Sequence, residues 1–341
     1  MDKDLLFRLL DAQGVSGNET EIRSLILTEI KDHVDDMHVD KTGNLIAHKK
    51  GRGQKVMIAA HMDQVGVIAK KISEEGRIYI STLGGIDPLT LIGQRVRIIS
   101  SKGKAIYGVI TTEQLHEGKD TEKLPVMADL YVDCGITEKE LDGLGIGIGV
   151  DIALMQSAVM IGGGFAVSGK ALDDRIGCYI LVRLIKSIRK PKSDLYFVFT
   201  VQEEVNFHGA QTSTFQIEPD WAIVVDVNNA RDFNVPPTGL LGKGTTVTIK
   251  DSDFIANKCL NDCIKEISEK KKIPVQWHVG DYHTSDAMKI SASKSGVPST
   301  VIGPAIRNIH TTIEVASIAD IENTVLIIEE LLRNPPEKCF V

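Results

Sequence analysis

The sequence lacks long apolar runs and a recognisable secretory signal. No uninterrupted apolar stretch reaches the roughly 18 residues that a membrane-spanning helix needs. The first residues, MDKDLLFRLLDAQG, place acidic side chains inside a short apolar stretch and lead to no small-residue cleavage site. We therefore expect a cytoplasmic protein with no membrane partner.

A block of basic residues is also lacking. The formal net charge is −7, and Lys and Arg do not cluster in the way that follows a phosphate backbone. The charge pattern therefore predicts that nucleic acid is not a partner.

Cysteine is scarce and irregularly placed. The chain has an odd number of cysteines, none of them in a CxxC pair: Cys134, Cys178, Cys259, Cys263 and Cys339. This spacing is typical of free thiols in a reducing cytoplasm, so we expect free thiols and assign no metal to them.

The length and composition indicate a soluble protein with more than one core. The chain has 341 residues, of which 43% are apolar and 25% are charged. This length exceeds that of an ordinary single-core domain and suits two domains. The sequence contains no internal repeat and no low-complexity segment.

The first segment reads as alternating helices and strands. Apolar spacing predicts helices over 3–10 and 19–34, with Ser16 or Asn18 available to cap the second helix. The stretches KTGNLIAHKK and KVMIAA that follow are typical of strands.

The pattern changes between residues 67 and 164. Short alternating stretches such as GRIYISTL and GKAIYGVIT, punctuated by glycine, predict a small all-β unit of barrel or sandwich type. From residue 165 the α/β rhythm returns. It brings a helix in RIGCYILVRLIKSI, strands in LYFVFTV, WAIVVDV and PSTVIG, and a last helix over 318–332. We therefore expect an α/β domain of residues 1–66 and 165–341, interrupted by a β insert of residues 67–164.

Acidic and imidazole side chains follow the apolar strands of the α/β part. His61 and Asp63 follow KVMIAA, Glu203 and Glu204 follow LYFVFTV, and Asp226 ends WAIVVD. His310 follows STVIG, and Asp173 and Asp174 precede a helix. The carboxyl ends of strands in an open α/β sheet are where ligands bind. Such imidazole and carboxylate ligands suit two divalent ions, zinc or cobalt rather than magnesium, with one carboxylate able to bridge them.

The adjacent glutamates can divide the work. One can hold a metal while the other acts as a general base, and dications would keep both ionised. Asp63 can accept the second ring N–H of His61 and fix its tautomer. Each feature also has a simpler interpretation: a solvated Glu–Glu turn, a chance HxD pair, acids at a helix start, or a surface His310. His208, His283 and Asp286 lie near these motifs, whereas His116 and His278 are expected on the surface or in packing.

The combination of motifs resembles the tetrahedral (TET) aminopeptidases, a family of glutamyl and deblocking aminopeptidases that includes proteins called endoglucanase or cellulase M. The resemblance covers nearly the whole chain. It is carried, in order, by GVSGNETEIR, HMDQVG, ADLYVDCGI, GIGIGVDIAL, GKALDDRIGC, QEEVNFHGA, VVDV and NIHTTIE.

The resemblance implies a role for each matched residue. His61 and Asp226 would bind one metal, Glu204 and His310 the other, with Asp173 bridging the two ions. Glu203 would be the general base, and Asp63 would orient His61. The resemblance further implies a phosphopeptidase-like mixed sheet flanked by helices, an insert used for dimerisation or as a lid, and a homo-oligomer from dimer to dodecamer.

The sequence also departs from the family pattern. Gln64 stands where Glu is usual, Asn206 where Gly is usual, and His208 where Arg is common. The usual RYIHSP is RNIHTT here, with Asn308, Thr311 and Thr312, and the segment after Asp226 reads NNARD. These changes bear on substrate preference and metal affinity, but they remove none of the implied ligands.

The predicted function is aminopeptidase action on peptides through a hydroxide that bridges two metals, with Glu203 as base. Zinc and cobalt are the expected metals, and manganese is a further candidate. One alternative is a glycoside hydrolase that uses Glu203 and Glu204. Successive residues on a strand point to opposite faces, which places them poorly for that chemistry. Another alternative is a catalytically silent assembly protein of the same fold.

Overall fold

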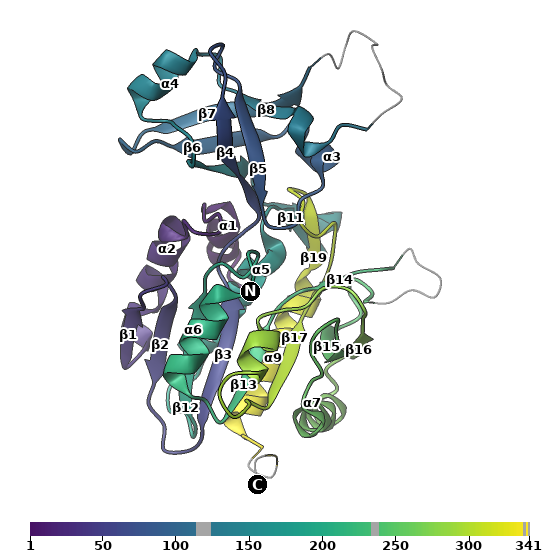
Figure 1. Cartoon of the computed structure of the whole chain (residues 1–341). Coiled ribbons are helices and arrows are strands. Elements are labelled where there is room, and N and C mark those ends of the chain that lie inside the picture. The colour runs from purple at the N-terminus through teal and green to yellow at the C-terminus, as the bar shows by residue number, and fades with distance from the viewer. Residues whose placement is uncertain (114–123, 233–238, 337–338, 340–341) are drawn as a thin grey trace.

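The computed structural model describes residues 1–113, 124–232, 239–336 and 339. Figure 1 shows an α/β body with helices on both sides of a large sheet and a small β-barrel at one end of it. None of the helices in these described ranges has the length and apolar character needed to cross a membrane. The mixed α/β architecture with a barrel-like β unit confirms the predicted fold class.

The large sheet has eight strands and a parallel centre. In spatial order they are β1 (Asp36–Val39), β2 (Leu45–Lys49), β12 (Asp194–Thr200), β3 (Lys55–His61), β13 (Trp221–Val225), β17 (Ser299–Gly303), β15 (Thr245–Lys250) and β16 (Val275–Val279). Strands β12, β3, β13 and β17 run parallel. They are apolar and buried on both faces, as parallel strands covered by helices are.

Helices cover both faces of this sheet. One face packs against α1 (Lys3–Asp11), α2 (Thr20–Ile30), α5 (Leu172–Ser187), α7 (Lys258–Lys271) and α9 (Ile318–Arg333). The other face packs against the shorter α6 (His208–Ile217) and α8 (Ala287–Ser291). Alternation along β3 shows the two faces, because Val56 and Ile58 join the first core while Met57 and Ala59 join the second.

A second sheet of five short strands lies between the large sheet and the barrel (Figure 1). Its strands, in spatial order, are β10 (Val159–Ile161), β11 (Ala166–Gly169), β19 (Glu314–Ser317), β18 (Ala305–Arg307) and β14 (Asn228–Asn229). Strand β11 leads directly into α5, and β18 connects to β19 through residues 308–313. This sheet therefore positions two of the segments that the sequence marked as functional.

The barrel is closed by antiparallel pairs. Its strands, around the barrel, are β4 (Gly66–Ile72), β5 (Ile78–Leu83), β8 (Leu130–Asp133), β7 (Ala105–Thr112), β6 (Arg95–Ile99) and β9 (Asp151–Met155). Two short helices accompany them, α3 (Pro88–Leu91) and α4 (Glu138–Leu144). Inward-facing apolar residues such as Val67, Ile98 and Val132 give the barrel its own core.

The predicted cap of the second helix is wrong. Glu19 occupies the N-cap position of α2, and no side chain caps this end. The hydroxyl of Ser16 instead donates to the carboxylate of Asp63 at 2.6 Å, and the amide of Asn18 donates to Asp151 at 3.1 Å. The buried carboxylate of Asp63 needs hydrogen-bond donors. The hydroxyl of Ser16 serves as one of them and is therefore not available to cap α2.

The expectation of free thiols is wrong for two cysteines. Cys259, in the first turn of α7, forms a disulfide with Cys339, which follows α9. The two residues are 80 positions apart in the sequence, and the packing of α7 against α9 brings them together. No local spacing could have signalled this pair.

The departure at Gln64 falls between two buried cations. The Lys170 ammonium donates to Gln64 Oε1 at 2.8 Å, and the Arg175 guanidinium donates to the same oxygen at 3.4 Å. Both cations also donate to the carbonyl of Ala12, which fixes the end of α1 against α5. Burial lowers the pKa of Lys170 well below its usual range, and the charge of Arg175 lowers it further.

Candidate active site

The candidate site lies at the carboxyl edge of the parallel strands. His61 is the last residue of β3, Glu203 and Glu204 follow β12, and Asp226 follows β13. These strands are neighbours in the sheet, so their carboxyl ends bring the four side chains to one place.

His310 reaches the site by another path. The sequence placed it just beyond the strand in PSTVIG, but β18 of the second sheet intervenes between β17 and His310. His310 lies in the connection from β18 to β19 with a φ of 60°. Its ring Nδ1 donates to the carbonyl of Gly85 at 2.8 Å, so a loop that follows barrel strand β5 orients this imidazole.

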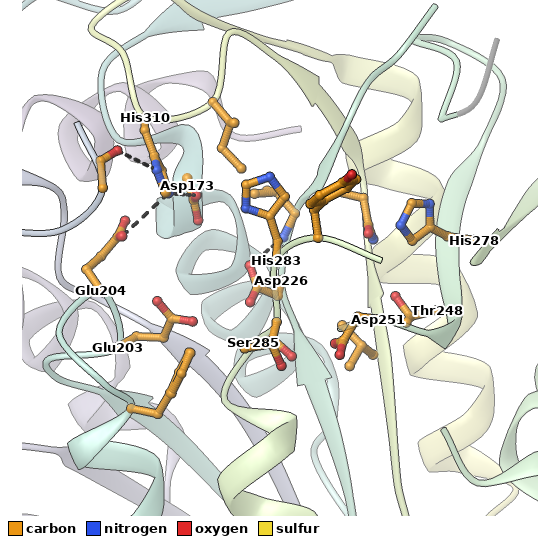
Figure 2. Close-up of a pocket in the computed structure, with 18 of the residues that line it drawn as sticks. Asp173, Glu203, Glu204, Asp226, Thr248, Asp251, His278, His283, Ser285 and His310 are labelled. Atoms are coloured by element: carbon orange, nitrogen blue, oxygen red, sulfur yellow. Dashed lines mark hydrogen bonds and ion pairs between the residues drawn. The ribbon is translucent and has the colours of Figure 1, made fainter. Parts of the chain in front are cut away.

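Asp173 is the centre of the site. One of its carboxylate oxygens lies 3.0 Å from His61 Nε2, and the other lies 3.4 Å from His310 Nε2. Figure 2 shows His310 and Glu204 converging on Asp173 at one side of the cavity. Glu204 completes this side, with Oε2 3.5 Å from His310 Nε2.

The side chains form compact groups of potential ligands. His61, Asp173 and Asp226 offer one set of atoms within 4.8 Å of one another, and Asp173, Glu204 and His310 offer a second such set. The two sets share Asp173. A third set joins His61 to both Glu203 and Glu204.

The adjacent glutamates do not lie on a strand. They lie in a turn after β12, and Gln202 before them has a left-handed φ of 55°. The prediction that Glu203 and Glu204 point to opposite faces of the sheet is therefore wrong, because the turn lets both carboxylates reach His61. The argument that the two glutamates point to opposite faces of a strand therefore no longer counts against a glycosidase.

Asp63 organises this turn. Its carboxylate accepts the backbone N–H of Glu203 at 3.0 Å and that of Glu204 at 3.2 Å. Its Oδ1 lies 3.5 Å from His61 Nδ1, whose closer acceptor is the carbonyl of Asp63 at 3.2 Å. Asp63 thus positions both the imidazole and the glutamate pair, and its links to the glutamates were not apparent from the sequence.

The electrostatics of the site reflect buried acids that lie close together. Burial raises the pKa of Glu203 and of Asp226 well above their usual range, and it raises the pKa of Glu204 to about 7. For His310, burial is outweighed by Asp173 and Glu204, and its pKa rises to about 10. The site therefore carries a strong demand for positive charge.

The donor set fits divalent metal ions. His310 Nδ1 and His61 Nδ1 both face carbonyl oxygens, so the Nε2 atom of each ring faces the carboxylates. Glu204 Oε1 is buried and has no hydrogen-bond partner among the described residues. Imidazole nitrogens and carboxylate oxygens that converge without donors between them are the ligands that zinc-type ions use.

A cavity of about 320 Å³ opens beside these groups. Figure 2 shows His283, His278, Asp251, Thr248 and Ser285 along its wall, opposite Glu203, Glu204 and Asp173. His278, expected on the surface or in packing, is partly buried and lines this cavity.

The other flagged residues are placed as follows. Asn206 lines the cavity, whereas His208 is exposed at the start of α6 and does not. His116 lies outside the described residues. Asp286 makes no side-chain cap for α8; it accepts the hydroxyl of Thr200 at 2.6 Å, and burial raises its pKa to about 6.

The comparison with protein families identifies this protein as a peptidase. The family of M42 glutamyl aminopeptidases matches residues 43–327, most of the chain. The chain belongs to this family and is therefore an aminopeptidase, a hydrolase of peptide bonds.

Individual relatives cover nearly the whole chain. A protein of Acetivibrio thermocellus, provisionally named an aminopeptidase, is 38% identical over 96% of this chain and 98% of its own. Among solved structures, a TET aminopeptidase from a marine sediment Thaumarchaeota archaeon is 31% identical, covers 99% of this chain and 98% of that chain, and has a TM-score of 0.94. The TET1 peptidase of Pyrococcus horikoshii, described as assembling into a tetrahedron or a large octahedral shell, is 29% identical, covers 97% and 99%, and has a TM-score of 0.89.

Sequence reasoning missed Glu314. This residue begins β19 and is 1% exposed. Its two oxygens accept the backbone N–H of His310 at 2.8 Å and that of Asp173 at 3.2 Å. Its position four residues after His310, in NIHTTIE, was the available signal. Glu314 is a positioning residue that joins the two sides of the site.

We predict that Glu314→Gln lowers kcat/KM by roughly 10–100-fold, because an amide cannot accept both backbone N–H groups and the two ligand segments shift. Asp320→Asn is the matched control. Asp320 is equally buried and also accepts two backbone N–H groups, those of Gly242 and Gly244, away from the cavity. Steady-state kinetics and thermal melting should separate the variants, with similar destabilisation and a kinetic loss only in Glu314→Gln. An equal kinetic loss in both would contradict the positioning role.

Proposed function

We propose that the protein is an aminopeptidase that uses two divalent metal ions. His61, Asp173 and Asp226 hold one ion, and Asp173, Glu204 and His310 hold the other. The proposal is supported above all by the two compact ligand sets that share Asp173. When bound, such ions supply Lewis-acid chemistry that acidifies water and polarises a carbonyl. Zinc or cobalt suits the mixed nitrogen and oxygen donors, and manganese is a further candidate.

Glu203 is the general base in this proposal. It lines the cavity, it belongs to neither of the two sets that share Asp173, and its Oε2 lies 4.0 Å from His61 Nε2. From there Glu203 takes a proton from the attacking water and returns it to the leaving amine. Asp63 holds the Glu203 backbone and the His61 ring in place while this transfer occurs.

The acidic wall accounts for action at the amino end of a peptide. Of the acids that line the cavity, Glu203 and Asp251 hold neither ion in this proposal, so their carboxylates are the ones that can attract a positive charge. The positively charged α-amine of a peptide is attracted there, whereas internal peptide bonds carry no such charge.

The barrel and the assembly form the last part of the proposal. Residues 67–164 are the insert that serves dimerisation or acts as a lid, and the residues outside it form the catalytic domain. The contact of Gly85 with His310 supports a link between the insert and the site. The assembling Pyrococcus horikoshii relative supports a homo-oligomer, from dimer to dodecamer. We place the enzyme in the cytoplasm, with peptides as its substrates.

We predict that a chelator abolishes hydrolysis of aminoacyl amides and that zinc, cobalt or manganese restores it. The measurement is the rate with each metal on a panel of substrates with free and blocked amino ends, which also gives the preferred first residue. Cleavage of a β-glucan that the chelator leaves unaffected would overturn the proposal in favour of a glycosidase. Failure to bind any of these metals would favour the silent assembly protein.

We predict that Glu203→Gln keeps its metal content but loses about 10²–10⁴-fold in kcat, because the amide cannot take the proton. Asp251→Asn is the control, since Asp251 lines the same cavity but accepts the backbone N–H groups of Asp253 and Phe254. Metal analysis and turnover are measured on both variants. Near-normal turnover of Glu203→Gln would exclude Glu203 as the base.

Asp173→Ala should lose both ions, because both ligand sets contain this residue. Asp226→Ala is the comparison and should lose only one, since Asp226 belongs to one of the two sets that share Asp173. The metal content per chain, measured by elemental analysis after gel filtration, distinguishes the two. If Asp173→Ala retained two full equivalents, the bridging role would be wrong.

A further inference from the structure

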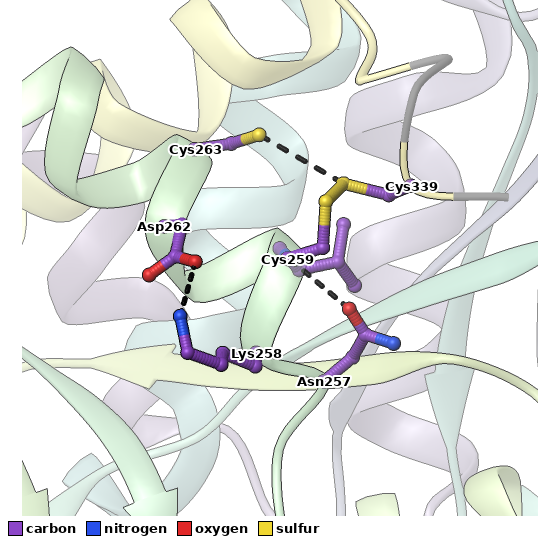
Figure 3. The surroundings of a disulfide bond; sticks show 7 residues. Asn257, Lys258, Cys259, Asp262, Cys263 and Cys339 are labelled. Carbon is purple, nitrogen blue, oxygen red and sulfur yellow. Dashed lines mark hydrogen bonds and ion pairs between the residues drawn. A yellow bond between two sulfur atoms is a disulfide. The ribbon is translucent and has the colours of Figure 1, made fainter.

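Three of the five cysteines meet at the packing of α7 against α9. Cys259 and Cys263 lie one turn apart on α7, and Cys339 follows α9. Figure 3 shows the Cys259–Cys339 disulfide with the sulfur of Cys263 beside it. The sulfurs of Cys263 and Cys339 are 3.9 Å apart, and all three sulfurs lie within 4.8 Å of one another.

The shape of this cluster distinguishes two kinds of sulfur chemistry. In thiol–disulfide exchange the Cys263 sulfur would attack the Cys339 sulfur in line with the Cys339–Cys259 bond. With 3.9 Å between the Cys263 and Cys339 sulfurs and an S–S bond of about 2.05 Å, the Cys263 and Cys259 sulfurs would then lie about 6 Å apart. The observed triangle is more compact than that. The cluster is therefore not arranged for exchange.

A triangle of sulfurs is what a thiolate metal site requires. With metal–sulfur bonds of about 2.3 Å in tetrahedral geometry, the sulfurs of a zinc site lie about 3.8 Å apart. The Cys263–Cys339 separation already has this value. Once the disulfide is reduced, Cys259 and Cys339 need only move apart to the same spacing.

The surroundings favour ionised sulfurs. Cys259 lies in the first turn of a 14-residue helix, where backbone N–H groups and the helix dipole stabilise a thiolate. Cys263 lines a groove between α7 and α9 whose charges balance, because Lys270 and Lys271 are matched there by Glu266 and Glu330. The open groove gives a water molecule access to the fourth coordination position.

We propose that, in the reduced protein, Cys259, Cys263 and Cys339 together bind one soft divalent cation, with zinc as the natural occupant. A dithiol reductant supplies two electrons and two protons, which convert the disulfide to two thiols while the dithiol closes into its own disulfide. The cation then displaces the thiol protons. When the Cys259–Cys339 disulfide is formed, two of the three ligands are oxidised and the site does not bind the cation.

The site is separate from peptide hydrolysis. The groove and the active-site cavity have no lining residue in common. Its effect is mechanical, because either the disulfide or the cation links the segment after α9 to the first turn of α7. Cys339 is thus linked to α7 by the disulfide under oxidising conditions and by the cation under reducing conditions. This structural role does not depend on the proposed active-site metals.

Cadmium is the probe, because its thiolate complexes absorb in the ultraviolet through charge transfer from sulfur, whereas nitrogen and oxygen ligands give no such band. The full-length protein is titrated after reduction by a dithiol and its removal, and again in the oxidised form. We expect one cadmium per chain with the thiolate band in the reduced protein and none in the oxidised protein.

Two serine variants test the ligands. Cys263→Ser leaves the disulfide able to form, so its fold is secured in the oxidised state, and after reduction we expect cadmium binding weaker by about tenfold or more. Cys339→Ser, which changes only the terminal segment, should show the same loss. Cys134→Ser is the matched control, since Cys134 is a half-buried barrel cysteine outside the cluster, and its titration should equal that of the wild type.

Three results would overturn the proposal. They are no thiolate band in the reduced wild type, wild-type affinity in reduced Cys263→Ser, and an equal band in the oxidised wild type. Peptidase activity is a separate readout and should be unchanged in Cys263→Ser, so failure here is distinguishable from failure of the proposed catalytic site.

Discussion

The burial of several acids around Asp173 is the constraint on which the rest of the site depends. Asp173 lies between His61 and His310, and further carboxylates on neighbouring segments crowd the same small volume. Burial makes each of these charges costly unless positive charge or a donor compensates it. The two histidines provide part of that compensation, and the converging Nε2 and carboxylate atoms leave room for cations to provide the remainder.

Two other buried carboxylates hold the backbone of the segments around Asp173 in place. Asp63 accepts the backbone N–H groups of the glutamate turn, and Glu314 accepts those of Asp173 and His310. Asp63 thereby joins the turn after β12 to the end of β3, and Glu314 joins the start of α5 to the connection between β18 and β19. A carboxylate with two acceptor oxygens can do this where an amide cannot, so these residues fix the spacing of the side chains that face the cavity.

The arrangement of the sheets brings these buried acids and histidines together. The parallel strands bring His61, the glutamate pair and Asp226 to one edge, and the second sheet adds Asp173 and His310. The barrel contributes through Gly85, whose carbonyl orients the His310 ring. The candidate site is therefore shared by all three β-structures, although each has its own strand pairing. Where α7 packs against α9, the disulfide joins Cys339 to Cys259, and the groove beside it shares no lining residue with the cavity of this site.

The sequence by itself determined the fold class and the family, and it predicted the residue types of the candidate site. Long apolar strands and a run of short alternating strands are local patterns that can be recognised in the sequence. The order of the family motifs can likewise be recognised without knowing which residues are in contact. Tertiary structure decided the rest. The Ser16–Asp63 bond joins residues 47 positions apart, the His310–Gly85 bond joins residues 225 apart, and the disulfide joins residues 80 apart. The turn that brings Glu203 and Glu204 to one side likewise depends on the buried Asp63 carboxylate. Such contacts arise from packing between distant segments, and no local spacing encodes them.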